Sequence, residues 1–237
     1  GRNFMFAGES PHDANNVCRI EADCLIYGDP HVITFDATQK LAAEYPTRRE
    51  FFRIRNRKAE EVNVFDEGNF WLVQSKDVHI QGWYNQRKEH STRTVLGGLA
   101  VGGPFLKNNT FIIRPLTGKI TWNGKEVLKH LGTKFSNHLI HAKYHKGAES
   151  ISDGRKGDGI DVTLPGNVKL TVNRFERGLA VKISMCARDW QDGQCGNFNG
   201  DASDDTQDLL MARVKPLHAK NKLPWREHRH LAAAKKV

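Results

Sequence analysis

Long hydrophobic runs are missing from this chain of 237 residues. The uncharged stretch at residues 95–106 contains four glycines and is much shorter than the roughly 20 apolar residues of a membrane-spanning helix. Three kinds of catalytic motif are also absent: a nucleophile elbow, a phosphate-binding loop and an HExxH zinc site. We therefore expect a protein without a membrane span and without enzymatic activity.

Cysteine is also scarce, and its spacing is informative. The four cysteines form two close pairs near opposite ends of the chain, Cys18 with Cys24 and Cys186 with Cys195. Neither pair has the CxxC spacing of zinc or redox sites. An even number divided in this way favours two disulfides that join the N-terminal segment to the C-terminal one in an oxidising compartment. Four buried free thiols are the alternative.

Acidic residues are scarce in the last part of the chain. The formal net charge is +9, and residues 212–237 contain eight Lys or Arg but one acid, Glu227. Such a tail is either a solvated terminus or a contact site for an acidic partner, for example an anionic glycan. The composition as a whole, 38% hydrophobic and 27% charged, is that of a soluble globular protein.

Short alternating runs dominate the pattern and predict β-strands. They recur between turn residues at 31–36, 51–56, 70–75, 77–84, 110–115, 119–128, 138–145, 159–175 and 178–186. Asn123-Gly124 between two such runs predicts a two-residue hairpin, and Gly97-Gly98 predicts another turn. Many short strands at this spacing indicate an all-β protein, either an antiparallel sandwich or an open barrel.

Helical periodicity is scarce before Thr206, and residues 206–220 predict one short helix. We divide the chain into a lead-in segment, 1–23, one β domain, 24–211, and a basic extension, 212–237. The chain begins with Gly1 rather than Met, so we expect a processed product or a piece of a longer protein.

Two stretches carry the strongest signals. "YGDPHVITFD", residues 27–36, places an acid-labile Asp-Pro bond ahead of an alternating run. "CGNFNGDASDD", residues 195–205, concentrates oxygen-bearing side chains in a glycine-containing loop, as Ca²⁺ requires. An EF-hand is excluded, because that loop needs Gly and Glu at positions that hold Ala202 and Asp208 here. An acidic solvated turn is the alternative.

Together the two stretches resemble the two ends of a von Willebrand factor type D domain. This family includes extracellular mucins, clotting, adhesion and yolk proteins, and some secreted luciferases. The resemblance spans residues 24–210 and implies an antiparallel β-sandwich whose first strand begins at the GDPH segment, here followed by a short helix and a basic tail. It also implies a disulfide between Cys24 and Cys195, which would leave Cys18 and Cys186 as the second pair.

The resemblance further implies a Ca²⁺ site. Its ligands, carried over to the matching positions, are Asp36, Asn197, Asn199, Asp204 and Asp205. Some relatives cleave themselves at Gly-Asp-Pro-His, which would make Asp29, Pro30 and His31 the reacting residues. In that reaction the Asp29 carboxyl attacks its own carbonyl carbon, proline is the leaving group, and His31 assists by proton transfer.

The cysteines depart from the family pattern. "CARDWQDGQC", residues 186–195, stands where relatives carry CxxC before Gly-Asn, and no cysteine-rich module follows it. We therefore do not expect disulfide-linked multimers.

We predict an extracellular or cell-surface structural or adhesion module that is stabilised by Ca²⁺. Protein partners are expected to dock through the basic segment 213–236, which carries Trp225 and Leu231 among its cations, and no nucleic acid partner is expected. The alternatives are a secreted luciferase-like enzyme and a fragment of a storage or lipid-transport protein.

Two further predictions concern a candidate glycan site and a group of three histidines. Asn108, in the single N-x-Ser/Thr sequon of the chain, is either a glycan site on a turn or an unmodified polar residue. His138, His141 and His145 are not expected to bind zinc, because a strand would point the first two to opposite faces.

Overall fold

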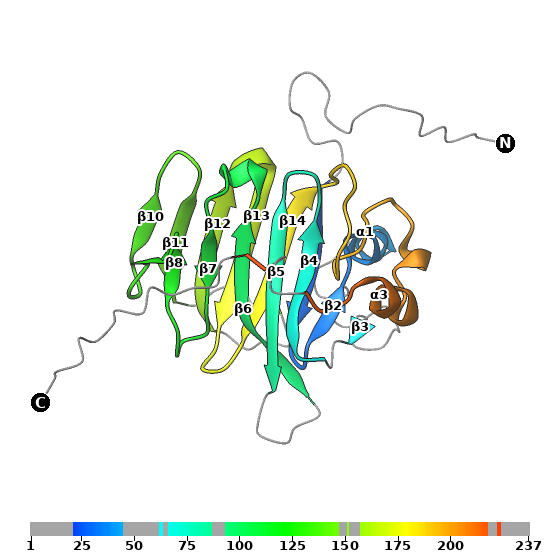
Figure 1. Ribbon diagram of the computed structural model, residues 1–237, viewed down its shortest axis with the longest axis horizontal. Coiled ribbons are helices and arrows are strands. Elements are labelled where there is room, and N and C mark those ends of the chain that lie inside the picture. The colour runs from blue at the N-terminus through cyan, green and yellow to red at the C-terminus, as the bar shows by residue number, and fades with distance from the viewer. Residues whose placement is uncertain are drawn as a thin grey trace, which may run out of the picture.

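The computed structural model describes residues 21–44, 62–63, 66–86, 93–146, 151, 157–217 and 222–223. These residues form two antiparallel β-sheets that share one core, with helices α1 (Phe35–Glu44) and α3 (Gln207–Arg213) at one end (Figure 1). The predicted antiparallel sandwich with a short C-terminal helix is confirmed.

The eight-stranded sheet has the order β10-β11-β12-β13-β14-β1-β2-β3. Along the chain, its strands are β1 (Glu21–Tyr27), β2 (His31–Ile33), β3 (Val62–Asn63), β10 (Lys134–Ser136), β11 (His141–His145), β12 (Asp158–Leu164), β13 (Val168–Arg174) and β14 (Leu179–Cys186). β1 pairs with both β14 and β2, with Cys24 opposite Ile183 and Ile26 opposite Val32. β1, the first strand among the described residues, is therefore an interior strand of this sheet.

The six-stranded sheet runs in chain order. It contains β4 (Gly68–Gln74), β5 (His79–Gln86), β6 (Thr94–Gly102), β7 (Phe111–Ile113), β8 (Ile120–Trp122) and β9 (Lys125–Val127). The β8–β9 turn is the predicted hairpin: Asn123 and Gly124 both have positive φ, 50° and 79°, as a type I′ turn requires. Three short 3₁₀ helices lie in loops: η1 (Pro104–Leu106), η2 (Pro165–Asn167) and η3 (Ala202–Asp204).

The inward faces of both sheets form the core. Fully buried side chains come from the six-stranded sheet and from the eight-stranded sheet alike, among them Phe70, Ile80, Leu99, Ile26, Val172 and Val181. Burying each such side chain contributes about 1.5–3 kcal/mol. Packing of the two sheets is therefore the main source of stability.

The segment around the Asp29-Pro30 bond differs from the sequence prediction. β1 ends before the bond, and residues 28–30 form the turn of the β1–β2 hairpin, so the expectation of a first strand beginning here was wrong. The predicted strand at 31–36 is also too long. The observed strand β2 ends at Ile33, and α1 begins at Phe35. The Thr34 hydroxyl accepts a hydrogen bond from the Ala37 N–H (3.3 Å), and good helix formers follow.

Gly97-Gly98, predicted as a turn, lies inside strand β6 instead. The glycines here serve packing rather than chain reversal. A Cβ at Gly97 would overlap the Asn85 side chain, while Leu99 and Val101 are fully buried. Periodicity alone did not distinguish a glycine-rich central strand from a turn.

Helix α3 crosses the predicted domain boundary at residue 212 and ends before the predicted residue 220. The chain beyond it still packs on the six-stranded sheet. Val214 is buried, the Leu217 N–H donates to the Asn69 carbonyl (2.7 Å), and the Leu223 N–H donates to Gln81 Oε1 (2.9 Å). The domain therefore includes Leu223, and residues 224–237 of the predicted tail lie outside the described residues.

A buried arginine joins the two sheets. Arg174 at the end of β13 is 5% exposed, and its guanidinium donates to three carbonyls of the β7–β8 loop, those of Arg114, Pro115 and Gly118, at 2.8 Å each. It also donates to the Tyr144 hydroxyl (2.8 Å). Because a guanidinium does not lose its charge, it needs all of these acceptors when buried.

Replacing Arg174 with Met should lower the free energy of unfolding by about 3 kcal/mol, because buried acceptors lose their donor. Urea unfolding measures the change. Arg177→Met, at an exposed arginine in the next turn, is the matched control. If both variants are as stable as the parent chain, Arg174 does not link the sheets.

Candidate functional site

Residues 187–205, which follow β14 and which we call the closing loop, meet three elements at Cys195. This residue is fully buried and disulfide-bonded to Cys24 of β1, with a Cα–Cα distance of 5.6 Å, so the structure contains the predicted pair. Its N–H donates to the Leu72 carbonyl of β4 (3.0 Å), and its carbonyl accepts the Phe35 N–H of α1 (3.1 Å). One residue thus holds both sheets and α1.

Neighbouring contacts reinforce this junction. Gln74 of β4 and Asp192 exchange backbone hydrogen bonds of 2.7 and 2.8 Å. The Tyr84 hydroxyl of β5 donates to Gln194 Oε1 (2.7 Å) in the core. Burial raises the pKa of the Tyr84 phenol, so the hydroxyl keeps its proton and remains a donor.

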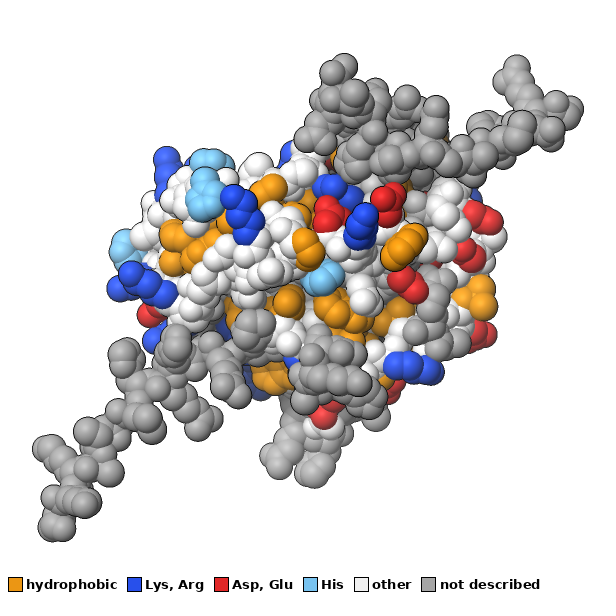
Figure 2. Space-filling view, turned by 45° about the horizontal axis from the view of Figure 1, so that its top comes forward, with side chains coloured by type: hydrophobic (Ala, Val, Ile, Leu, Met, Phe, Trp, Pro, Cys, Tyr) orange, Lys and Arg blue, Asp and Glu red, His pale blue; other side chains and the backbone are white. Residues whose placement is uncertain are grey.

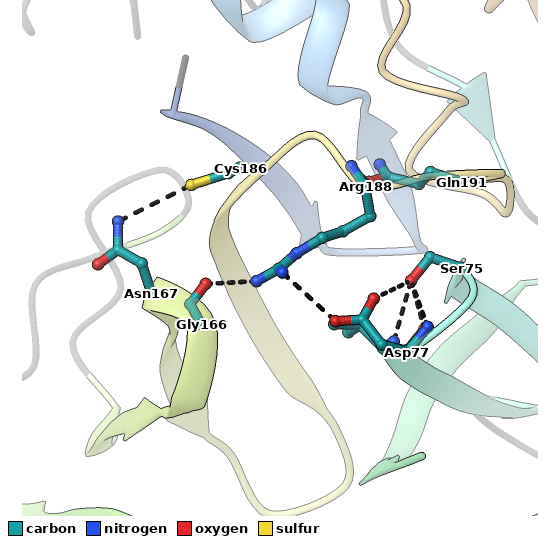
Figure 3. A network of polar contacts seen from close by, with 8 residues as sticks. Ser75, Asp77, Gly166, Asn167, Cys186, Arg188 and Gln191 are labelled. Carbon is teal, nitrogen blue, oxygen red and sulfur yellow. Dashed lines mark hydrogen bonds and ion pairs between the residues drawn. The ribbon is translucent and has the colours of Figure 1, made fainter. Parts of the chain in front are cut away.

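The start of the closing loop is anchored by Arg188. Its guanidinium lies between two turns, one from each sheet (Figure 3). It contacts the Asp77 carboxylate in the β4–β5 turn (3.3 Å) and donates to the Gly166 carbonyl in the β12–β13 turn. Ser75 in turn donates to Asp77 (3.0 Å). The closing loop is therefore attached to both sheets at its beginning as well as at Cys195.

Two glycines allow the close approach of this loop to its neighbours. Gly193 and Gly196 have φ of 129° and 85°, values that favour glycine. A Cβ would overlap the Leu72 carbonyl at the first position and the Asp205 carboxylate at the second. Both positions therefore require glycine for space as well as for conformation.

Beyond Cys195 the loop lies against the first turn of α1. The Asp36 carboxylate is 3% exposed and accepts the N–H groups of Asn199 (3.1 Å) and Gly200 (2.9 Å). Beside it the rings of Phe35 and Phe198 stack with centroids 4.9 Å apart. Residues from the two ends of the domain are thus in direct contact.

The electrostatics of this contact are unfavourable to an isolated carboxylate. Burial raises the pKa of Asp36, and the negative charges of Asp204 and Asp201 raise it further, while the two backbone donors lower it. Positive charge placed among these carboxylates would relieve both the burial cost and the repulsion.

Asp204 completes the cluster. Its Oδ2 accepts hydrogen bonds from the side-chain amides of Asn197 and Asn199, both at 2.8 Å, whereas its Oδ1 is buried with no hydrogen-bond partner. Turning either amide by 180° would present an oxygen in place of the NH₂ group. Asp205 is buried, with its carboxylate against Gly196.

Comparison with known families gives a match to part of the chain. Residues 107–209 match the family model of the von Willebrand factor type D domain. This match supports membership of the chain in the von Willebrand factor type D family. The match begins before β7 and ends within α3, so it includes the whole closing loop, while Cys24 and Asp36 lie before it. A search of curated proteins returns no match.

The five predicted ligands of the type D domain form an oxygen-only set. Among the described residues, no group of three or more His, Cys, Asp and Glu side chains is arranged to hold a metal. The predicted set is of another kind, because it adds the Asn197 side-chain oxygen and the Asn199 backbone carbonyl to three carboxylates. A buried carboxylate oxygen without a partner and an all-oxygen donor set fit a hard cation such as Ca²⁺ rather than Zn²⁺.

The Asp29-Pro30 bond lies in the β1–β2 turn, where Gly28 has a φ of 69°. The Asp29 carboxylate forms an ion pair with Arg93 (2.9 Å), and the His31 ring lies 5.4 Å from the Tyr27 ring. Self-cleavage would require the carboxyl to leave Arg93 and turn to its own carbonyl carbon. The ion pair opposes that step.

The remaining predicted residues are only partly described. Cys186 is disulfide-bonded, and Cys18, its predicted partner, lies outside the described residues, as do Trp225 and Leu231. Asn108 is exposed in the turn after η1, so its glycosylation stays a prediction. No helix among the residues that the structure describes is long and apolar enough to cross a bilayer.

Sequence reasoning missed the anchoring role of Arg188 and the exposure of Trp190. The ring of Trp190 is 89% exposed, and its backbone is left-handed with a φ of 54°. Both residues lie in the segment between Cys186 and Cys195, which the sequence analysis treated only as a departure from the family spacing. The length of this segment is the feature of the sequence that could have indicated the anchoring role, because a longer loop can reach both sheets.

Proposed function

We propose that this chain is a non-catalytic extracellular module of adhesion or assembly whose type D domain is closed by Ca²⁺. Type D domains are generally non-catalytic, typically extracellular and active in protein–protein assembly. The luciferase-like and lipid-transport alternatives gain no specific support from the described residues and are not proposed.

The observation that carries the proposal is the meeting of Asp36 with the closing loop. The carboxylates of Asp36, Asp204 and Asp205 would hold the ion together with the Asn197 side chain and the Asn199 carbonyl. Ca²⁺ accepts six to eight oxygen ligands, and the five proposed here would come from α1 and from the loop after Cys195. The ion would therefore strengthen the contact that the disulfide already makes between the beginning and the end of the domain.

Chelation of Ca²⁺ should lower the melting temperature, and added Ca²⁺ should restore it, because a ligand of the native state stabilises that state by mass action. At a hundredfold excess over the Kd the gain is about 2.7 kcal/mol. Asp204→Asn should remove most of the shift. Asp66→Asn, at an exposed acid before β4, is the matched control and should keep it.

Identical melting curves with chelator and with Ca²⁺ would contradict the proposed site. A Ca²⁺ shift that Asp204→Asn leaves intact would place the ion elsewhere.

For the partner, the proposal is a protein surface with acidic character that docks on the C-terminal tail. Residues 224–237 contain Trp225 and four Lys or Arg. Burying Trp225 against a neighbouring chain would contribute about 2–3 kcal/mol, and the cations would add a salt-sensitive attraction. The contacts of Leu217 and Leu223 with the sheet mean that this segment, and not the whole of 212–237, is the separable part.

Deleting residues 224–237 should leave the fold and the Ca²⁺ shift intact and reduce partner recovery in a pull-down from native extract at low salt. At high salt the difference between the two chains should shrink, because the attraction is screened. Equal recovery by both chains at low salt would rule out docking through the tail.

A further inference from the structure

Strands β8 to β11 form the end of the sandwich opposite helices α1 and α3 (Figure 1). β9 is the edge of the six-stranded sheet and β10 is the edge of the eight-stranded sheet. We call residues 119–146, which contain these strands and their connecting loops, the basic end. The structure describes every residue of this segment.

The charge of the basic end is strongly one-sided. It contains six lysines and four histidines against a single acid, Glu126, and Figure 2 shows Lys and His side chains gathered at this end of the molecule. Glu126 is already engaged by Lys119 (3.4 Å). The other lysines are exposed and form no ion pair within the described part of the chain: Lys125, Lys129, Lys134, Lys143 and Lys146.

Two of these lysines face each other across strands. Lys134 of β10 lies directly opposite Lys143 of β11, and like charges in directly opposed positions destabilise an antiparallel pair. On its other side, Lys143 lies opposite Asp161 of β12. The Asp161 carboxylate contacts His145 (2.7 Å) rather than Lys143. An anion that bridges the two ammonium groups would remove their repulsion.

Protection of sheet edges explains only part of this pattern. Lysines on edge strands prevent edge-to-edge pairing of sheets, which accounts for Lys125 on β9 and Lys134 on β10. Lys143 is different, because β11 pairs on both sides, with β10 and with β12. Lys129 and Lys146 lie outside the strands altogether.

The side chains present select the class of anion. The basic end contains no arginine, so its cations are separate ammonium groups rather than planar guanidinium forks. Its aromatic residues, Trp122, Phe135 and Tyr144, pack against the core, and therefore do not offer the stacking faces on which single-stranded nucleic acids bind. Separate point charges on neighbouring strands, which lie about 4.8 Å apart, suit a linear chain of sulfate groups.

We propose that the basic end binds a sulfated polysaccharide, with Lys134 and Lys143 at the centre of the contact. The inference rests on the proposed extracellular function, since sulfated polysaccharides are polyanions of the extracellular matrix. It assigns them to residues of the folded domain that are not part of the C-terminal tail. Binding releases counterions from the polyanion, so the affinity falls steeply with salt.

The test is titration of the full chain with a heparin oligosaccharide of defined length, at several salt concentrations. Lys134→Gln combined with Lys143→Gln should weaken binding about tenfold, at the upper range of what two exposed ionic contacts contribute, and should make the salt dependence shallower. Lys76→Gln combined with Lys215→Gln is the matched control. It removes the same charge from exposed lysines elsewhere and should change the affinity less than twofold. Because every chain carries the same tail, the tail does not account for a difference between the two pairs of substitutions.

Equal weakening by both pairs of substitutions would overturn the proposal, because net charge alone would then explain binding. A single-stranded oligonucleotide of matched charge that binds as tightly, and loses as much in the Lys134 and Lys143 variant, would overturn the assignment to sulfated polysaccharide. If that variant fails to fold, Lys129→Gln with Lys146→Gln tests the same end from its loops. The Ca²⁺ melting shift is read separately in each chain, so failure of this inference is distinguishable from failure of the proposed function.

Discussion

The covalent and hydrogen-bonded junction at Cys195 is the constraint on which the rest of the domain depends. Its side chain is bonded to β1 of the eight-stranded sheet, its N–H to β4 of the six-stranded sheet and its carbonyl to α1. The disulfide joins positions 171 residues apart, and a cross-link over so long a separation strongly restricts the unfolded chain. The same residue thus limits the unfolded state and connects the layers of the folded one.

Besides the shared core and the Cys195 junction, two arginine side chains connect the two sheets. Arg174 fastens the β7–β8 loop to β13, and Arg188 fastens the closing loop to a turn of each sheet. Arg174 donates mainly to backbone carbonyls, whereas Arg188 contacts one backbone carbonyl, of Gly166, and one carboxylate, of Asp77. The cluster of Asp36 and Asp204 lies beside the Cys195 junction, so an ion bound there would act on a contact that is already ordered. The basic end lies at the opposite end of the sandwich from α1 and this cluster.

Features set by local sequence could be predicted, whereas features set by packing could not. Alternating runs gave most of the strands, and Asn123-Gly124 gave its hairpin, because both signals act within a few residues. The pairing of Cys24 with Cys195 came from the family resemblance. Helix α1 was missed because three strand-like residues precede it, and β6 was missed because Gly97 makes room for Asn85. The roles of Arg174 and Arg188 depend on acceptors distant in sequence, and no local pattern predicts them.

Native-state hydrogen exchange of the Phe35 and Cys195 amides tests the central claim most directly. These two amides donate across the junction, to the Cys195 carbonyl and to the Leu72 carbonyl. If the junction holds the domain together, they exchange only through global unfolding, with the same free energy as the most protected amides of β13 and β14. A Cys24→Ala, Cys195→Ala chain should then lose protection in both sheets together. Exchange of the Phe35 and Cys195 amides at a much lower free energy, with β13 and β14 still protected, would show that the closing loop opens alone and would contradict the account.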